Sequence, residues 1–293
     1  MTTKIAVMVV HGIGNQTEDY YYDIRNHIKE HFAKKLGRGV NKAADEVVIE
    51  PAWWAPVLTE QDAEFHERIK KGGPTGFPNL RSFILHTAAD AVAYQPIASN
   101  RVLYDDIHDV VAKALNRLAE KAGDNAPLCI IAHSLGTIVA SNYIWDLQFH
   151  DPAIKPLISP QVVGVMGDTP LEKGETLAHF YTLGSPIALW SLRWRMFDYG
   201  KPIAFPSPYL GNHYPNLKGE WINFYDKDDV IGYPMKGLNK DYYERVVEDR
   251  EVNVGNWNEF WNPLSHNGYW NSPLVYEPIA ASLAKTWQQI NAN

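Results

Sequence analysis

One stretch, Cys129-Ile-Ile-Ala-His-Ser-Leu-Gly-Thr-Ile-Val-Ala-Ser141, carries the clearest pattern in the chain. An apolar run typical of a buried strand leads directly into Ala132-His-Ser-Leu-Gly136, and small and apolar residues typical of a helix follow. The pattern predicts a strand, a sharp turn and a helix, with Ser134 at the turn. Such a turn holds its central residue in a strained backbone conformation and raises the serine Oγ above the edge of a sheet.

Small residues flank Ser134, as expected where a strand and a helix come close together. Gly136 fits this requirement, and Ala132 stands where glycine is more usual, alanine being the next smallest side chain. The Leu135 N–H and the positive end of the helix dipole would both point to where an oxyanion could form. The alternative interpretation is that Ser134 is an ordinary helix N-cap, a position that serine favours.

Strands and helices are predicted to alternate along the rest of the chain. Apolar runs predict strands at 5–10, 47–49, 128–132, 177–183, 221–225 and 245–254, with a short one at 162–165. Helical spacing predicts helices at about 18–36, 104–122, 135–148 and 278–290. Continuous apolar runs are typical of strands buried on both faces. We therefore expect an α/β fold with a mostly parallel central sheet and helices on both faces.

The length of 293 residues suits a single domain spanning 1–293. Two stretches interrupt the alternation of strands and helices. Residues 51–103 contain a Gly72-Gly73-Pro74 break, and residues 190–218 are rich in proline and aromatic residues. We interpret both as cap-like or loop insertions near the functional site.

The net charge of −7, with no run of Lys or Arg longer than two, argues against nucleic acid as a partner. A transient lipid interface stays open, and the aromatic stretch from Trp190 to Tyr209 is the best place for it. The single cysteine, Cys129, fits a reducing compartment. The apolar run at 5–10 is too short for a signal peptide, and no run approaches the roughly 20 apolar residues of a membrane span, so we expect a cytoplasmic protein.

A glycine-containing loop, His11-Gly12-Ile13-Gly14, follows the first predicted strand. A tetrahedral oxyanion needs two donors, and the N–H groups of Leu135 and Ile13 could supply them. Gly12 would let the loop approach closely, and His11 would stabilise it. The competing interpretation is a dinucleotide-binding loop, but the third glycine of that fingerprint is missing.

A general base for Ser134 is expected after the last predicted strand. His266 is the only histidine after His213, and it lies in the segment Pro263-Leu-Ser-His-Asn-Gly-Tyr-Trp270. An orienting acid is expected between the serine and the histidine, at the end of the strand at 221–225. Asp229 is preferred there, because the apolar pair after it would hold its carboxylate inward, and Asp226 is the second choice.

These motifs, together with Tyr181-Thr-Leu-Gly-Ser-Pro186, resemble the α/β-hydrolase superfamily, and within it the serine lipases and esterases of the fungal type. The resemblance implies hydrolysis of a small-molecule or lipid carboxylic ester through an acyl-enzyme on Ser134. It also implies a triad of Ser134, Asp229 and His266, an oxyanion hole at Gly12, Ile13 and Leu135, and no metal or cofactor. A thioesterase, an acyltransferase or a noncatalytic scaffold of the same fold remain as alternatives.

One pair of histidines has the spacing of metal ligands. His27 and His31 are four residues apart on a predicted helix, as zinc ligands can be, but the H-E-x-x-H pattern is absent. We expect these histidines to flank the apolar side of the helix instead.

Overall fold

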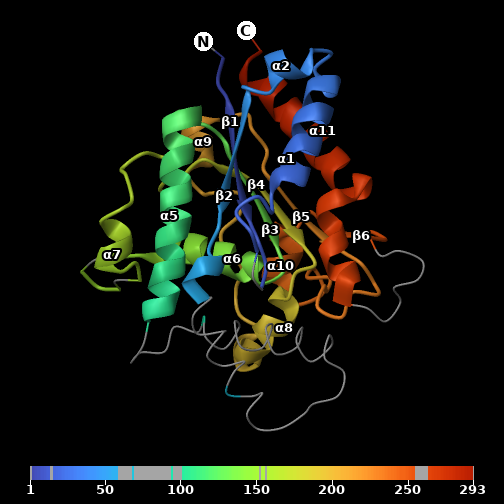
Figure 1. Ribbon diagram of the computed structural model, residues 1–293. Helices are drawn as coiled ribbons and strands as arrows, with labels where there is room; N and C mark the ends of the chain where they lie inside the picture. The colour runs from blue at the N-terminus through green and yellow to red at the C-terminus, as the bar shows by residue number, and fades with distance from the viewer. Residues whose placement is uncertain are drawn as a thin grey trace.

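The computed structural model describes residues 2–13, 16–58, 68, 94, 101–151, 153–155, 157–254 and 263–292. Among them six strands form one parallel sheet in the order β2-β1-β3-β4-β5-β6 (Figure 1). The strands are β1 Ile5–Val10, β2 Val47–Ala52, β3 Leu128–His133, β4 Leu177–Leu183, β5 Glu220–Tyr225 and β6 Glu248–Glu251. The α/β architecture with a parallel sheet agrees with the expectation from sequence.

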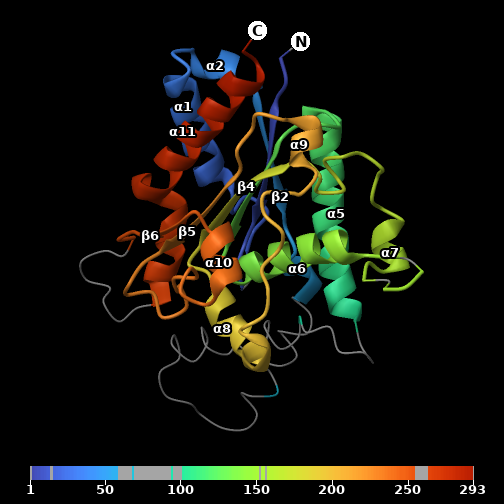
Figure 2. The ribbon, with the colours of Figure 1, turned by 180° about the vertical axis from the view of Figure 1, so that it is seen from behind.

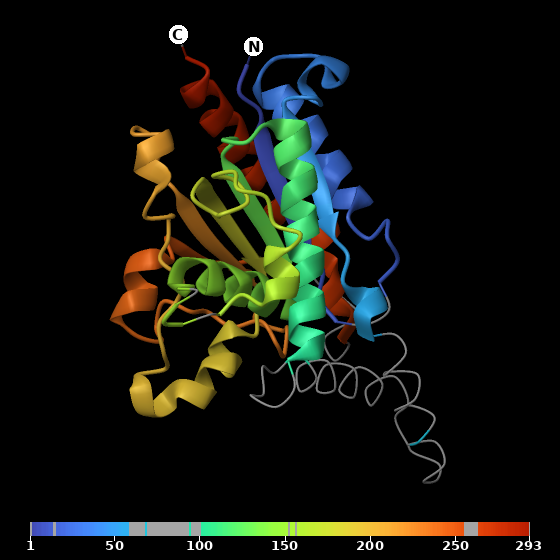
Figure 3. The same ribbon diagram turned by 90° about the vertical axis from the view of Figure 1, so that its left-hand side faces the viewer.

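Helices cover both faces of this sheet. Helices α1 (Tyr22–Lys35) and α11 (Pro273–Ile290) lie together on one face, and α5 (Val102–Ala122) and α6 (Leu135–Phe149) lie on the other (Figures 1 and 2). Seen from the side, α5 crosses in front of the sheet while α1 and α11 lie behind it (Figure 3). Each face therefore has its own hydrophobic core.

Strand β1 shows why these runs are apolar throughout. Its residues are all fully buried, and they alternate between the two cores. Met8 packs in the core under α5 and α6, whereas Val7 packs in the core with Ile28 of α1 and Leu283 of α11. Burial on both faces leaves no position for a polar side chain, which explains the continuous run.

Most predicted elements are confirmed, and three differ from the structure. Residues 162–165 do not form a strand, because Ser159 caps a short helix, α7 (Pro160–Val163), by accepting a hydrogen bond from the Val162 N–H. The strand predicted at 245–254 is shorter and spans Glu248–Glu251, and α10 (Lys240–Arg245) ends at its first predicted residue. The last helix begins at Pro273, with Pro278 inside it.

The two expected insertions fare differently. Residues 190–218 contain short helices in place of one long loop: the end of α8 (Ile187–Ser191), the 3₁₀ helix η1 (Leu192–Phe197) and α9 (Leu210–His213). Most of 51–103 lies outside the described residues. Within the described ranges no helix has both the length and the apolar character needed to cross a membrane.

Candidate active site

The strand order reverses at β1, whose neighbours in the sheet are β2 and β3. After β1 the chain moves outward to β2, and it then returns to the other side of β1 to form β3. Ligands of open parallel sheets bind where the strand order reverses in this way, because the two connections diverge there. The loop that begins at His11 and the turn at Ser134 both lie at this point.

Ser134 has the strained backbone that its sequence context predicts. Its φ is 54° and its ψ is −132°, between the end of β3 and the start of α6. A non-glycine residue in this region carries a cost of roughly 1–3 kcal/mol and persists only where its surroundings hold it. The Ser134 N–H donates to the Leu183 carbonyl over 2.9 Å, and its own carbonyl accepts from the N–H and the hydroxyl of Thr137. The Ser134 side chain makes no capping hydrogen bond to α6.

The glycines around the serine are required by close packing. A Cβ on Gly136 would lie 2.2 Å from the carbonyl oxygen of His11, so α6 and the end of β1 touch through their backbones. A Cβ on Gly12 would lie 2.5 Å from Ser134 Cβ and 3.1 Å from its Oγ. The Gly12 backbone is thus held directly against the serine.

The predicted oxyanion donors are placed at this contact. Leu135 is the first residue of α6, where the backbone N–H has no intrahelical carbonyl to bond. Ile13 follows Gly12, and its side chain packs against the core under α5 and α6. Gly14 lies outside the described residues.

His11 holds the loop rather than facing a substrate. Its Nε2 accepts hydrogen bonds from the N–H groups of Trp54 (3.0 Å) and Ala55 (3.2 Å), and its ring stacks on the Trp54 indole. Its Nδ1 donates to the Gly12 carbonyl over 2.7 Å. Burial lowers the pKa of His11 to about 3, so the ring stays neutral and keeps this tautomer. The expectation that His11 stabilises the loop is confirmed.

The structure brings Asp229 and His266 together. Asp229 Oδ2 lies 2.8 Å from His266 Nδ1, and both side chains are buried. The Tyr269 hydroxyl donates to the same oxygen over 2.9 Å, and the Ile231 N–H donates to Oδ1 over 3.0 Å. Burial raises the pKa of Asp229, but the hydrogen bonds and charge of His266, with the other two donors, outweigh it and lower the pKa to about 2. Asp229 is therefore ionised at neutral pH.

Asp226, the second choice from sequence, has a different environment. Its carboxylate accepts hydrogen bonds from the N–H groups of Val254 (2.7 Å) and Asp228 (2.9 Å), and so it shapes the turn after β5. Only one of the two apolar residues that were expected to hold the Asp229 carboxylate inward is buried. Ile231 is buried as expected, whereas Val230 is 69% exposed. One apolar residue, rather than a pair, turns the chain back.

Gly184, at the end of β4, makes room for the acid and the base. Its φ is +53°, and a Cβ there would lie 2.8 Å from Asp229 Oδ2 and 3.1 Å from His266 Cε1. Gly232 is also restricted, because its Cβ would lie 2.8 Å from the same oxygen. Both glycines are needed for space next to the buried Asp229–His266 pair.

His133 also contacts the candidate site, although its sequence context did not single it out. Its Nε2 donates to the main-chain oxygen of His266 over 2.6 Å, and the two rings lie 4.6 Å apart between centroids. Burial lowers the pKa of His133 to about 3. Because Ser134 follows His133 directly, the serine and the His266 segment are joined through one side chain. In the sequence, only the position of His133 next to Ser134 indicated that it belongs to this site.

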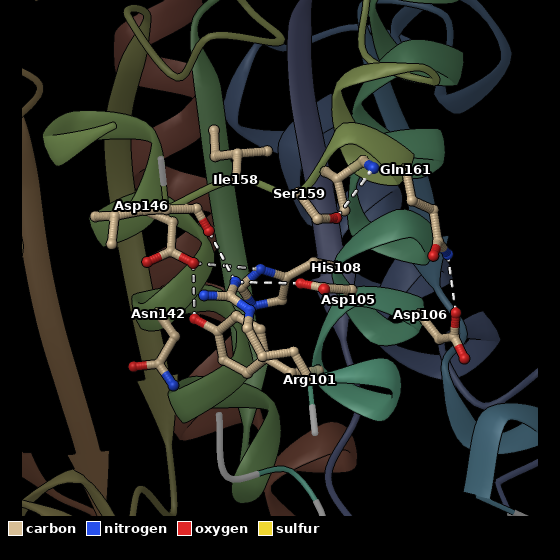
Figure 4. Close-up of polar contacts among 12 residues, drawn as sticks. Arg101, Asp105, Asp106, His108, Asn142, Asp146, Ile158, Ser159 and Gln161 are labelled. Carbon is tan, nitrogen blue, oxygen red and sulfur yellow. Dashed lines mark hydrogen bonds and ion pairs between the residues drawn. The ribbon is translucent and has the colours of Figure 1, made fainter. Parts of the chain in front are cut away.

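A second polar cluster lies between α5 and α6, away from the serine (Figure 4). The Tyr104 hydroxyl donates to Asp146 Oδ2 over 2.8 Å, and His108 Nδ1 lies 3.7 Å from the same oxygen. Burial raises the pKa of Asp146 to about 6, although the hydrogen bond from Tyr104 opposes the shift. These contacts join the two helices that cover one face of the sheet.

His27 and His31, which were expected to flank the apolar side of their helix, pack against α11. His27 stacks on Tyr276, with centroids 4.3 Å apart, and His31 lies 3.8 Å from a carboxylate oxygen of Glu277. Both histidines therefore contact α11. Within the part of the chain that the structure describes, no group of three His, Cys, Asp or Glu side chains could hold a metal ion.

Comparison with known proteins adds no assignment. Neither a scan against protein-family models nor a search of curated proteins matches this chain.

Proposed function

We propose that this protein is a serine hydrolase with an α/β-hydrolase fold, which cleaves carboxylic esters through an acyl-enzyme on Ser134. The observation that carries the proposal is one connected arrangement at the strand-order reversal. A serine with a φ of 54° follows β3, and the residue before it is hydrogen-bonded to the segment that carries a buried His266–Asp229 pair. An ordinary N-cap serine needs neither the strained backbone nor the buried pair.

Each residue has a defined role in the proposed reaction. The Ser134 Oγ attacks the ester carbonyl, and His266 Nε2 takes its proton. The alcohol leaves with that proton, and water, deprotonated by His266, then releases the acid. General-base assistance of this kind contributes about 10²–10⁴-fold.

Asp229 supports the base in two ways. As an ionised acceptor it keeps the proton of the neutral imidazole on Nδ1, which leaves Nε2 to act as the base. It also stabilises the imidazolium that forms during attack. The N–H groups of Leu135 and Ile13 would bind the oxyanion, and loss of one such donor typically costs about 10²–10³-fold in kcat.

The test is hydrolysis of p-nitrophenyl esters from acetate to palmitate by the wild type and by Ser134→Ala. We expect activity that disappears in the variant and a chain-length profile that separates an esterase from a lipase. Ser282→Ala, on α11 at the opposite face of the sheet, is the matched control and should keep full activity.

Labelling by a fluorophosphonate probe tests the nucleophile without any assumption about the substrate. Wild type and Ser282→Ala should be labelled, and Ser134→Ala should not. An unlabelled wild type that hydrolyses no ester would contradict the proposal. Labelling combined with transfer to an added alcohol or thiol acceptor would redefine the reaction as acyl transfer on the same serine.

A further inference from the structure

A cavity of about 450 Å³ opens beside α6, between α8, η1 and α10. It begins close to the proposed nucleophile. Ile138 lines it four residues after Ser134 along α6, and Ile187 lines it two residues after Ser185. Its volume falls in the range of pockets that hold a small organic ligand. Ser134 and His266 themselves do not line it, so it can serve as a place for a substrate part remote from the reacting carbonyl.

Aromatic residues are the largest group in the wall of the cavity. Its aromatic residues are Trp145, Trp190, Trp194, Phe197, Tyr199 and Tyr242. Tyr242 is buried and Trp145 and Trp190 are half-buried, whereas Trp194, Phe197 and Tyr199 are exposed. The exposed group marks an open side toward solvent, and the buried group offers an apolar interior.

The same cavity has a cationic rim. Lys155, Arg193 and Lys201 line it, all of them exposed, and no Asp or Glu is among its described lining residues. The Arg193 guanidinium lies over the rings of Trp190 (4.9 Å) and Trp194 (5.3 Å), which places the charge at the mouth. In a chain with a net charge of −7 this local excess of cations is selective for anions.

Among the described residues, two aspartates that interact with rim lysines lie outside the cavity lining. Asp241 affects Lys201 from outside the cavity, and it also forms an ion pair with Arg245 at 2.9 Å. Asp146 lies in the cluster between α5 and α6 and accepts from Tyr104. Neither aspartate lines the cavity.

We propose that this cavity binds the substrate's apolar chain and that the cationic rim binds an anionic group, a carboxylate or a phosphate, at the far end of the chain. The inference rests on the proposed function for the position of the ester at Ser134, but the cavity and its rim are independent of it. The apolar chain would run past Ile138 and Ile187 between the half-buried indoles. The substrate class is thus an ester with an ω-anionic chain.

Binding is tested in the full chain carrying Ser134→Ala, so that no hydrolysis occurs. Dodecanoate, dodecyl phosphate, dodecanol and dodecyltrimethylammonium are titrated below their micelle concentrations and followed by tryptophan fluorescence and calorimetry. We expect both anions to bind more tightly than the alcohol and the cation, and more weakly as salt is raised. The comparison of the two anions identifies the preferred head group. Equal or tighter binding of the alcohol or the cation would overturn the proposal.

Three substitutions locate the site. Arg193→Gln and Lys201→Gln should each weaken anion binding about threefold, and the double variant about tenfold, because exposed charge pairs contribute only a fraction of a kcal/mol to about 1 kcal/mol each. Arg195→Gln is the matched control, since Arg195 lies on the same 3₁₀ helix but does not line the cavity. Unchanged anion binding in the double variant, or equal loss in the control, would overturn the proposal. Lys201 is exposed, so its variant keeps the test valid even if Arg193→Gln does not fold.

Activity separates this inference from the proposed function. The p-nitrophenyl monoester of a dicarboxylic acid is compared with the ester of the monocarboxylic acid of equal length. The wild type should have the higher kcat/KM for the anionic ester, and Arg193→Gln/Lys201→Gln should lower kcat/KM for the anionic ester by a larger factor than for the neutral ester. If neither ester is hydrolysed but the anions still bind, the proposed function fails and the cavity assignment stands.

Discussion

His133 Nε2 donates a hydrogen bond to the main-chain oxygen of His266 over 2.6 Å. This bond ties the last residue of β3 to the segment that carries the proposed base. Because the carbonyl is buried and accepts from a neutral ring, the bond does not change with protonation at moderate pH. We therefore expect His133 to position His266 in the proposed reaction.

His133→Phe should lower kcat by about tenfold to a hundredfold with little change in KM. The variant keeps a ring but leaves the His266 carbonyl without its donor, and an unsatisfied buried acceptor costs about 1–3 kcal/mol. His133→Gln, whose amide can donate, should recover part of the rate. Steady-state kinetics and the melting temperature are measured together. Equal loss of stability in both variants without any difference in kcat would refute the positioning role.

Asp229→Asn and Asp226→Asn should have opposite signatures. The first should lower kcat by roughly 10³–10⁴-fold, because the imidazole loses the acceptor that selects its tautomer. The second should lower the free energy of unfolding by about 1–3 kcal/mol, because the amide has only one accepting oxygen and must turn its NH2 group toward the N–H of either Val254 or Asp228. The Asp226 variant should keep kcat within tenfold in the folded protein. Kinetics and urea denaturation of both variants decide, and a large kcat loss in Asp226→Asn alone would reverse the assignment.

Gly184→Ala should reduce both stability and activity. Its φ of +53° makes any side chain unfavourable, and the added Cβ would press against Asp229 Oδ2 at 2.8 Å. We expect a loss of about 1–3 kcal/mol in the free energy of unfolding. Gly211→Ala in α9 is the control, because a Cβ there meets nothing within 4 Å. It should leave the proposed activity unchanged and the stability the same or slightly higher. A Gly184 variant as stable and active as the control would refute the packing argument.

Asp146 should make stability depend on pH in an unusual direction. Burial raises its pKa from 3.8 to about 6, so between these values the native state binds a proton that the unfolded state has released. The stabilisation is complete below pH 3.8 and is lost as pH rises through 6. The free energy of unfolding of the wild type relative to Asp146→Asn should therefore fall by roughly 2–3 kcal/mol from pH 4 to pH 7.

Urea denaturation of both proteins at the two pH values tests this prediction. Asp106→Asn, on the outer side of α5 beside Gln161, controls for the loss of one charge. If the difference between wild type and Asp146→Asn is the same at pH 4 and pH 7, Asp146 does not titrate between them.

Local patterns were sufficient for most of the fold. The limits of β4 (Leu177–Leu183) and the start of α6 after Ser134 could be predicted because apolar runs and small residues act over a few positions. The strand predicted at 162–165 is wrong for the same reason. Three valines suggest a strand, but the cap at Ser159 and Pro160 after it begin a helix.

The sequence by itself determined that Ser134 would stand at a turn between a buried strand and a helix, since the apolar run, the serine and Gly136 lie within a few residues of one another. It also placed His11-Gly12 at the end of a strand. Only the tertiary structure decided that Asp229, rather than Asp226, meets His266, and that His133 and Gly184 hold that pair. Those contacts join residues far apart in the chain, and they depend on strand order and on distances of a few ångströms that no local pattern encodes.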